Sequence, residues 1–466
     1  MTELHLVVDR SRGVRAGVER ALREAIRTLP PDTRLPSSRS LAADLGIARN
    51  TVADAYTQLV QEGYLTTARG AGTHTVAQAS KVSGPDIGDS SGEAGFLFDL
   101  RPGRPDVSTF PVAAWNAATR HVLNTRPREA LQYDDARGPA YAREVLAGYL
   151  HRARGVQADP DQIVLCSGVR QAAALLFRAA ANHGARSFAY ERPGQPAIPV
   201  QLHRAGLQGR PIQVDRYGLD VGQLGDAGGV LLTPAHQFPM GVPLAPKRRT
   251  DVLRWARATG AIVLEDDYDG EFRYDRQPIG ALQGLAPDVV AYAGSASKTL
   301  APGLRLGWLV VPRHLLAAVI EEKTWTDRHS DTLTQLTLAA LIESGAYDRH
   351  VRAARLRYRH RRDDLIHALG NHHAGANHYP GANDRAGAGR QPGGIAAGLQ
   401  LVIDLPGRDE SAVLRTLHDH GINTFGMSHF GSGLPSALVI GYGAPARHAW
   451  TRTLSALIDA LQNAQL

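Results

Sequence analysis

The segment Ser295-Ala296-Ser297-Lys298, followed by Pro302-Gly303-Leu304-Arg305-Leu306-Gly307, decides the fold of most of this chain. A lysine stands among small hydroxyl residues, and an arginine follows shortly after it. The amine of Lys298 can form a Schiff base, while hydroxyls and a guanidinium can bind a phosphate. These groups are what a site for pyridoxal phosphate (PLP) requires, so the segment predicts such a site.

Around this segment, runs of apolar residues with the length of strands alternate with helical stretches. This alternation predicts an α/β fold, with a mostly parallel sheet and crossover helices. A stretch rich in Gly, Ala, His and Asn at 371–394 predicts a loop, and a small C-terminal α+β lobe is expected over about 335–466. The expected strands of the sheet are 162–166, 186–190, 230–233, 261–265, 289–293 and 306–311, and those of the lobe are 399–403 and 438–441.

Three further motifs follow predicted strands and suit the same coenzyme. In Glu265-Asp266-Asp267-Tyr268, a carboxylate can pair with the protonated pyridine nitrogen, and the tyrosine can donate to the phenolic oxygen. Which of the three acids does so remains open at this point. The turn Ser167-Gly168-Val169-Arg170 opens a helix whose free N–H groups suit a phosphate. The polar loop that contains His236 follows another strand and is placed to meet the ring.

The N-terminal region predicts a separate DNA-binding module. Apolar residues at helical spacing predict a helix over 14–29, a short helix from Ser37 or Ser38 to Leu45, and a third over about 49–62. Two short strands, 64–67 and 73–76, read as a hairpin. Three helices and a hairpin in this order make a winged helix-turn-helix over residues 1–77. Residues 78–97 read as a linker, and 98–466 as the coenzyme-binding domain.

The third helix is the expected reader of the major groove. Arg49 can offer a bidentate fork to guanine, and Asn50 and Thr51 can reach base edges or phosphate. Arg39 and the wing, with Gly70 and Thr73, would hold the DNA backbone. The net charge of +7 and the pI near 9.6 permit nucleic-acid binding. Residues 1–77 themselves are only weakly basic, with ten arginines against eight acids.

Both halves resemble known families. The string from Arg34 to Tyr56 resembles the GntR class of bacterial repressors over about 10–77, and the coenzyme motifs resemble the fold-type I aminotransferase domain over about 98–466. With Tyr-Asp-Asp-Ala-Arg-Gly at 133–138 and Thr-Pro-Ala-His-Gln-Phe-Pro at 233–239, the whole chain resembles the MocR subfamily of bacterial transcriptional regulators. The resemblance implies a homodimer that binds operator DNA. It also implies that Lys298 carries PLP, that Asp266 binds the pyridine nitrogen and Tyr268 the phenolic oxygen, and that the phosphate is held by Ser295, Ser297, Arg305 and the turn Gly168, Val169 and Arg170.

At two positions the chain departs from that pattern. Gln195 stands where effector-binding relatives carry a tyrosine, and Val439 stands where an arginine would clamp an α-carboxylate. Valine cannot form a bidentate pair with a carboxylate. Either the effector is something other than an ordinary amino acid, for example PLP itself, or another arginine provides the clamp. We favour the first explanation.

The expected function is a PLP-dependent regulator that senses PLP or a PLP-reactive molecule, with the aminotransferase-like domain acting as a sensor and not as an enzyme. An active aminotransferase and a repressor with a vestigial pocket are the alternatives. A single cysteine, Cys166, suits a reducing cytoplasm. We expect no signal peptide, no membrane span and no metal site.

Overall fold

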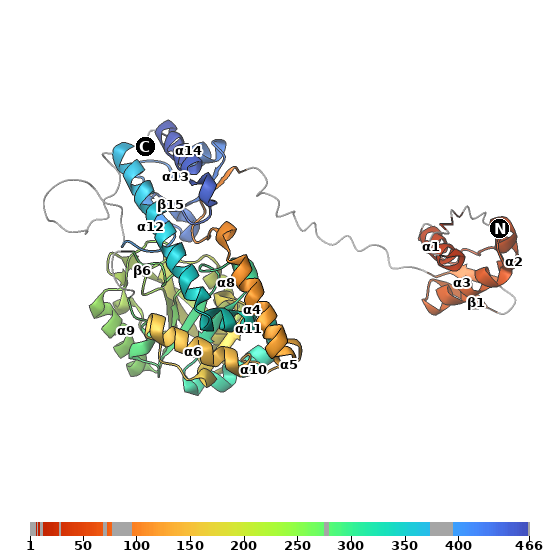
Figure 1. Cartoon of the computed structure of the whole chain (residues 1–466), viewed down its shortest axis with the longest axis horizontal. Coiled ribbons are helices and arrows are strands. Elements are labelled where there is room, and N and C mark those ends of the chain that lie inside the picture. The colour runs from red at the N-terminus through yellow and green to blue at the C-terminus, as the bar shows by residue number, and fades with distance from the viewer. Residues whose placement is uncertain are drawn as a thin grey trace. The chain divides into compact units, whose positions relative to one another are not determined.

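The computed structural model describes residues 6, 8–9, 13–27, 29–68, 72–76, 96–274, 279–372 and 395–464. The chain divides into two compact units, Met1–Gly92 and Glu93–Leu466 (Figure 1). Gly70 and most of the expected linker and loop, residues 78–95 and 373–394, lie outside the described residues. Among the described helices, none combines the length and the apolar character needed to cross a membrane.

The N-terminal unit has the expected winged helix-turn-helix order. The side chain of Ser37 caps α2 by accepting a hydrogen bond from the Ser40 N–H at 3.1 Å, and Gly46 ends that helix with a φ of +64°. Val18, Leu41 and Val52, one from each helix, are buried in a common core. The elements are α1 (Val14–Ile26), α2 (Ser38–Leu45), α3 (Arg49–Gln61), β1 (Leu65–Ala68) and β2 (Gly72–Thr75).

The larger unit contains the predicted sheet. Strands β5, β6, β8, β9 and β10 run parallel to one another, while β7 is antiparallel to β6 and β11 is antiparallel to both β10 and β4. The sheet order is β4-β11-β10-β9-β8-β5-β6-β7, which confirms the expected α/β class. The strands are β4 (Ile163–Cys166), β5 (Ser187–Arg192), β6 (Gln208–Asp215), β7 (Gly218–Leu219), β8 (Gly229–Leu232), β9 (Ile262–Asp266), β10 (Val290–Ser295) and β11 (Gly307–Val310).

Helices cover both faces of this sheet, and the alternation along β10 shows which helix lies on which face. On one face, Val290 packs with α9 and Tyr292 packs with α6 and α11. On the other face, Ala291 and Ala293 pack with α7, α8 and α10. The central strands are buried on both sides, as parallel strands usually are. The helices are α4 (Val112–Thr125), α5 (Pro127–Leu131), α6 (Ala140–Arg154), α7 (Val169–Asn182), α8 (Ala197–Arg204), α9 (Pro246–Thr259), α10 (Arg313–Asp327) and α11 (Thr332–Glu343).

Strand β6 was not expected from the sequence. It lies near the edge of the sheet, and most of its residues are exposed or half-buried. Its sequence contains Arg210 and Pro211, and proline is tolerated in strands only at such edges. The apolar run that identifies a central strand is therefore missing from β6.

The small C-terminal lobe begins later than the expected residue 335. Helix α11 packs against α4 and α6, so it belongs with the main sheet. The chain passes from the main core to the lobe within α12 (Ala346–His372), because Tyr347 packs in the main core and Ala354 packs in the lobe. The lobe contains β12 (Gln400–Asp404), β14 (Phe425–Gly426) and β15 (Ala437–Gly441), the pair β3 (Phe98–Asp99) and β13 (Ile422–Asn423), and the helices α13 (Glu410–Asp419) and α14 (Trp450–Asn463).

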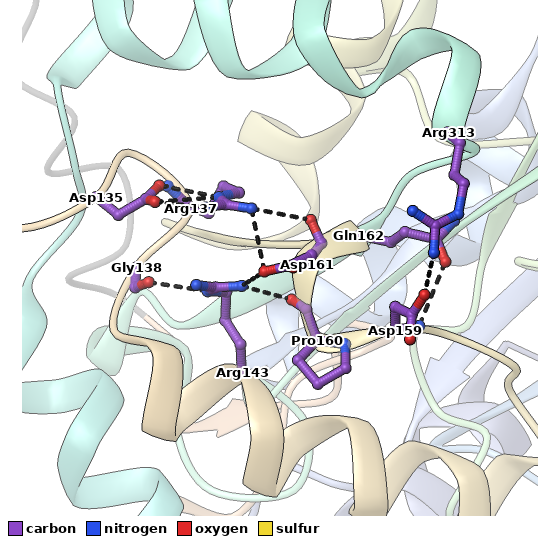
Figure 2. A network of polar contacts seen from close by, with 9 residues as sticks. All are labelled: Asp135, Arg137, Gly138, Arg143, Asp159, Pro160, Asp161, Gln162 and Arg313. Atoms are coloured by element: carbon purple, nitrogen blue, oxygen red, sulfur yellow. Dashed lines mark hydrogen bonds and ion pairs between the residues drawn. The ribbon is translucent and has the colours of Figure 1, made fainter.

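A buried arginine ties the 133–138 motif to the main sheet. Arg143, on α6, donates to the carbonyl oxygens of Gly138 at 3.0 Å and Pro160 at 2.8 Å, and it pairs with Asp161 at 2.9 Å (Figure 2). Arg137 pairs with Asp135 in the same network. Arg143 thus joins the turn before α6 to the residues that lead into β4.

We predict that Arg143→Ala lowers the free energy of unfolding of the larger unit by about 2 kcal/mol, because the two buried carbonyls lose a charged donor. Urea denaturation followed by tryptophan fluorescence measures this. Arg254→Ala, which removes an exposed arginine on α9, is the control. Equal midpoints of urea denaturation for Arg143→Ala and Arg254→Ala would show that the Arg143 network adds no stability.

Candidate functional site

The predicted coenzyme residues gather at the carboxyl end of the parallel strands. Asp266 is the last residue of β9 and Ser295 the last of β10, and these neighbouring strands pair Ala293 with Asp266. His236 follows β8, and Gly168 follows β4. In open α/β sheets, ligands bind at this edge.

Of the three consecutive acids, only Asp266 keeps an oxygen without a partner. Both oxygens of Glu265 accept backbone N–H groups, from Leu282 and Gln283, each at 2.9 Å. Both oxygens of Asp267 are bound by Arg154, at 2.6 and 2.9 Å. Within the described part of the chain, no donor reaches the buried Oδ1 of Asp266.

The surroundings of Asp266 destabilise the ionised form of its carboxyl group. The carboxyl is 2% exposed, and Gln195 Nε2 donates to its Oδ2 at 3.1 Å. Burial, with the neighbouring charge of Asp267, raises the pKa of Asp266 to about 7. A cation beside Oδ1 would offset this cost, because it would restore a charge partner to the ionised form.

Lys298 is half-buried beside Gly103 and Phe238. A Cβ atom built on Gly103 would stand 3.5 Å from the Lys298 Nζ and 3.8 Å from the ring of Phe238. Burial lowers the pKa of Lys298, and the positive charge of Arg104 adds to this effect, while Asp266 opposes it. A lowered pKa favours the neutral amine, which is the nucleophilic form of lysine.

Tyr268 and His236 belong to one buried chain of hydrogen bonds. Gln400 Nε2 donates to the Tyr268 hydroxyl at 2.8 Å, and His236 Nδ1 lies 3.0 Å from the same oxygen. His236 Nδ1 also lies 2.8 Å from Asp269 Oδ2, which fixes the position of the imidazole. Burial raises the pKa of Tyr268, so its hydroxyl stays protonated. Gln400 was not identified from the sequence, since it stands in no motif for coenzyme binding. Asp269 directly follows Tyr268 in the 265–274 motif, but no role was predicted for it.

An anion cradle forms where α7 begins. Gly168 has a φ of +96°, and a Cβ atom built on it would stand 3.5 Å from the Arg305 Nη1. A Cβ built on Gly307, in β11, would lie 2.6 Å from the Gly168 Cα, so this approach requires glycine. The first turn of α7, which starts at Val169, has no side-chain cap and no acidic residue. Its free N–H groups and the nearby guanidinium suit a phosphate.

The hydroxyl residues and Arg170 are placed less directly. Ser295 is buried, and its Oγ accepts from the Ser297 N–H at 3.4 Å. The side chain of Arg170 lines an open groove between α7 and α8, together with Arg178 and Arg204. Arg170 is therefore available to the cradle through its backbone N–H.

The two departures from the family pattern have clear structural settings. Gln195 bonds to Asp266, as described above. Val439 is fully buried in β15, in an apolar cluster with Val402 and Phe430. A carboxylate at this position would lie in apolar surroundings.

In the N-terminal unit, the predicted DNA-binding residues lie at helix starts and in the hairpin. Arg49 and Asn50 are exposed at the start of α3, where Ala48 provides no side-chain cap. Thr51 follows them and is half-buried. Arg39 is exposed on α2, and Thr73 pairs with Thr67 in the hairpin.

Comparison with known proteins links this geometry to two families. Residues 98–446 match "Aminotransferase class I and II", and residues 15–75 match "Bacterial regulatory proteins, gntR family". The chain is 31% identical to the HTH-type pyridoxine biosynthesis transcriptional regulator PdxR of Corynebacterium glutamicum, over 93% of this chain and 92% of that protein. It is 29% identical to the probable rhizopine catabolism regulatory protein MocR of Rhizobium meliloti, over 79% of this chain and 80% of the relative.

Solved structures show the same fold for the larger unit. The kynurenine aminotransferase of Pyrococcus horikoshii superposes with a TM-score of 0.68 at 23% identity, covering 79% of this chain and 91% of that one. The multiple substrate aminotransferase of Thermococcus profundus gives a TM-score of 0.69 at 21% identity, over 79% and 92%.

We predict that Asp266→Asn stabilises the coenzyme-free protein in a pH-dependent way. Because the pKa of Asp266 is raised in the folded state, its contribution to stability is complete below about pH 4 and is lost as the pH rises to about 7. The asparagine variant escapes this loss, so its advantage grows across that window to about 4 kcal/mol and is constant above it.

Urea denaturation at several pH values between 4 and 8 measures this difference. Asp419→Asn, at an exposed position, is the control for removal of a carboxylate. An advantage of Asp266→Asn that did not change with pH would contradict the assignment of a buried, destabilised carboxyl.

Proposed function

Because the chain belongs to the MocR-type subfamily of GntR transcriptional regulators, we propose that it binds PLP at Lys298 and that PLP itself is the signal for its action on DNA. The observation that carries this proposal is the buried Oδ1 of Asp266, which lacks a donor at the edge of the sheet where Lys298 has a lowered pKa. A protonated pyridine nitrogen is the kind of donor that this oxygen requires.

The residues of the site fit the parts of the coenzyme. Asp266 would bind the ring nitrogen, Lys298 would hold the coenzyme covalently, and Tyr268 would donate to its phenolic oxygen. Arg305 and the start of α7, with Ser295 and Ser297, would bind the phosphate. His236, held by Asp269, would keep the tyrosine in place. When bound, PLP supplies an aldehyde that reacts with amines and a ring that withdraws electrons.

Two features favour PLP over an amino acid as the signal. Val439 packs in an apolar cluster, so β15 offers no arginine to a carboxylate at that position. Gln195 donates a hydrogen bond to the carboxylate of Asp266. This contact helps to hold the acid that would bind the ring, and it does less to bind an incoming amine. The name of the Corynebacterium relative, a regulator of pyridoxine biosynthesis, agrees with this choice.

The N-terminal unit would carry the DNA contacts. Arg49, Asn50 and Thr51 at the start of α3 would read the major groove, while Arg39 and Thr73 would hold phosphates. Such a regulator would work in the cytoplasm, where the chromosome lies. Binding of PLP to one unit and of DNA to the other would be coupled, and such coupling acts equally in both directions.

We also propose a homodimer. Leu131, Tyr133 and Trp325 are 70%, 77% and 83% exposed, which is unusual for large apolar residues. They lie together, since the Tyr133 ring contacts His329 and Arg328, just beyond α10. A second copy of the chain would cover this surface, and sedimentation velocity reports the dimer directly.

We predict that Lys298→Ala abolishes both the visible absorption band of the bound coenzyme and the effect of PLP on DNA affinity. The alanine removes the amine to which the coenzyme would be attached. PLP is titrated while absorbance is followed, and binding to the DNA upstream of the protein's own gene is measured with and without PLP. Lys247→Ala, at a lysine 87% exposed, is the matched control.

The outcomes separate the proposed function from its rivals. A lysine-dependent band with no change in DNA affinity would point to a second ligand. Conversion of the coenzyme to its amine form by common amino acids, again without an effect on DNA, would favour an aminotransferase. The absence of any band would leave a repressor with a vestigial pocket.

A further inference from the structure

Helix α9 has a net charge of +4, but its Arg248, Arg254 and Arg257 are paired with carboxylates. Helix α12 is equally basic. Its sequence contains seven arginines against three aspartates, a net charge of +4 in a chain whose total is +7. The DNA-binding region 1–77 has a surplus of only two positive charges. The helix that joins the main sheet to the small lobe is thus more basic than the module expected to bind DNA (Figure 1).

The arginines of α12 form two groups. The inner group has structural partners: Arg357 donates to Thr109 at 3.0 Å, and Arg361 pairs with Asp106 at 2.9 Å. The outer group lies on the exposed side and its flank, opposite the buried residues Ala354 and Tyr358. This outer group, called here the arginine stripe, comprises Arg349, Arg352, Arg355 and Arg359, while the side chain of the neighbouring Arg362 is only 15% exposed.

Little negative charge faces the stripe. Asp348 forms an ion pair with Arg152 of α6 at 2.8 Å. Asp363 lies 3.7 Å from Arg359 and 3.6 Å from Arg362, so one carboxylate is shared by two guanidinium groups. Among the described residues, no carboxylate lies within ion-pair distance of Arg352 or Arg355. These charges are available to an anionic partner.

We propose that the arginine stripe binds the phosphate backbone of double-stranded DNA, as a contact of the larger unit additional to the recognition helix. The spacing supports this, since the helical rise places Arg349 and Arg359 about 15 Å apart. That length spans several phosphates along a duplex. Arginine also suits the task, because its planar fork binds phosphate oxygens in pairs. The inference rests on the DNA binding proposed above, and it names a second surface for it.

The test compares two full-length variants that lose the same charge. Arg352→Gln/Arg355→Gln/Arg359→Gln removes the centre of the stripe, and Arg254→Gln/Arg257→Gln/Arg415→Gln removes three exposed arginines from α9 and α13. Affinity for a long duplex, from upstream of the protein's own gene or of scrambled sequence, is measured over a range of salt concentrations. Thermal unfolding checks that both variants are folded.

We predict that the stripe variant lowers the slope of log affinity against log salt by about 2 to 3, since each lost phosphate contact contributes about 0.9. The loss should be the same on both duplexes, because backbone contacts carry no sequence information. A slope equal to that of the α9/α13 variant would overturn the proposal. Binding of polyglutamate to the stripe, with no change in the salt slope for DNA in the stripe variant, would also overturn the proposal. The partner of the stripe would then be an acidic protein.

Arg49→Gln separates this inference from the proposed function. That change should reduce discrimination between the two duplexes and leave the contribution of the stripe to the salt slope intact. If the wild-type chain bound neither duplex, the DNA-binding function and the stripe would both be rejected. The other outcome is that the wild-type chain binds both duplexes, that Arg49→Gln loses discrimination, and that the stripe variant keeps the wild-type salt slope. In that case only the DNA contact of the stripe would be rejected.

Discussion

The carboxyl of Asp266 is buried at the end of β9 with one oxygen that no described donor reaches, and the rest of the site is arranged around it. The two neighbouring acids are already satisfied, Glu265 by backbone N–H groups and Asp267 by Arg154. A buried carboxylate that lacks a full set of partners costs free energy. A cationic ring nitrogen would offset that cost, which links the stability of the larger unit to coenzyme binding.

The sheet brings the other groups to the same edge. Pairing of β9 with β10 places the strand that leads to Lys298 beside Asp266, and β11 returns between β10 and β4. Glycines at 168 and 307 allow these strands to approach closely enough for Arg305 to reach the start of α7. Helix α12 then passes from the main core to the small lobe. One helix therefore contacts both parts of the unit and also carries a net charge of +4.

Much of this arrangement could be predicted from the sequence, for physical reasons that differ between elements. The central strands are continuous apolar runs, and helices α1 to α3 have clear periodicity and end signals, so both were recognised. Strand β6 is polar because it lies near an edge, and it was missed. The choice of Asp266 among three acids, and the roles of Gln400 and Asp269, depend on partners that lie 17 or more residues away in the chain. Such contacts leave no local pattern in the sequence.

The most direct test of the coupled sensor is the affinity of the wild-type protein for PLP, measured with and without the DNA upstream of its own gene. If PLP changes DNA affinity, linkage requires DNA to change PLP affinity by the same factor, typically about 5-fold to 150-fold. The account predicts such a shift in the wild type and its absence in Lys298→Ala. An identical PLP affinity in the presence and absence of DNA would contradict it, because the two units would then act independently.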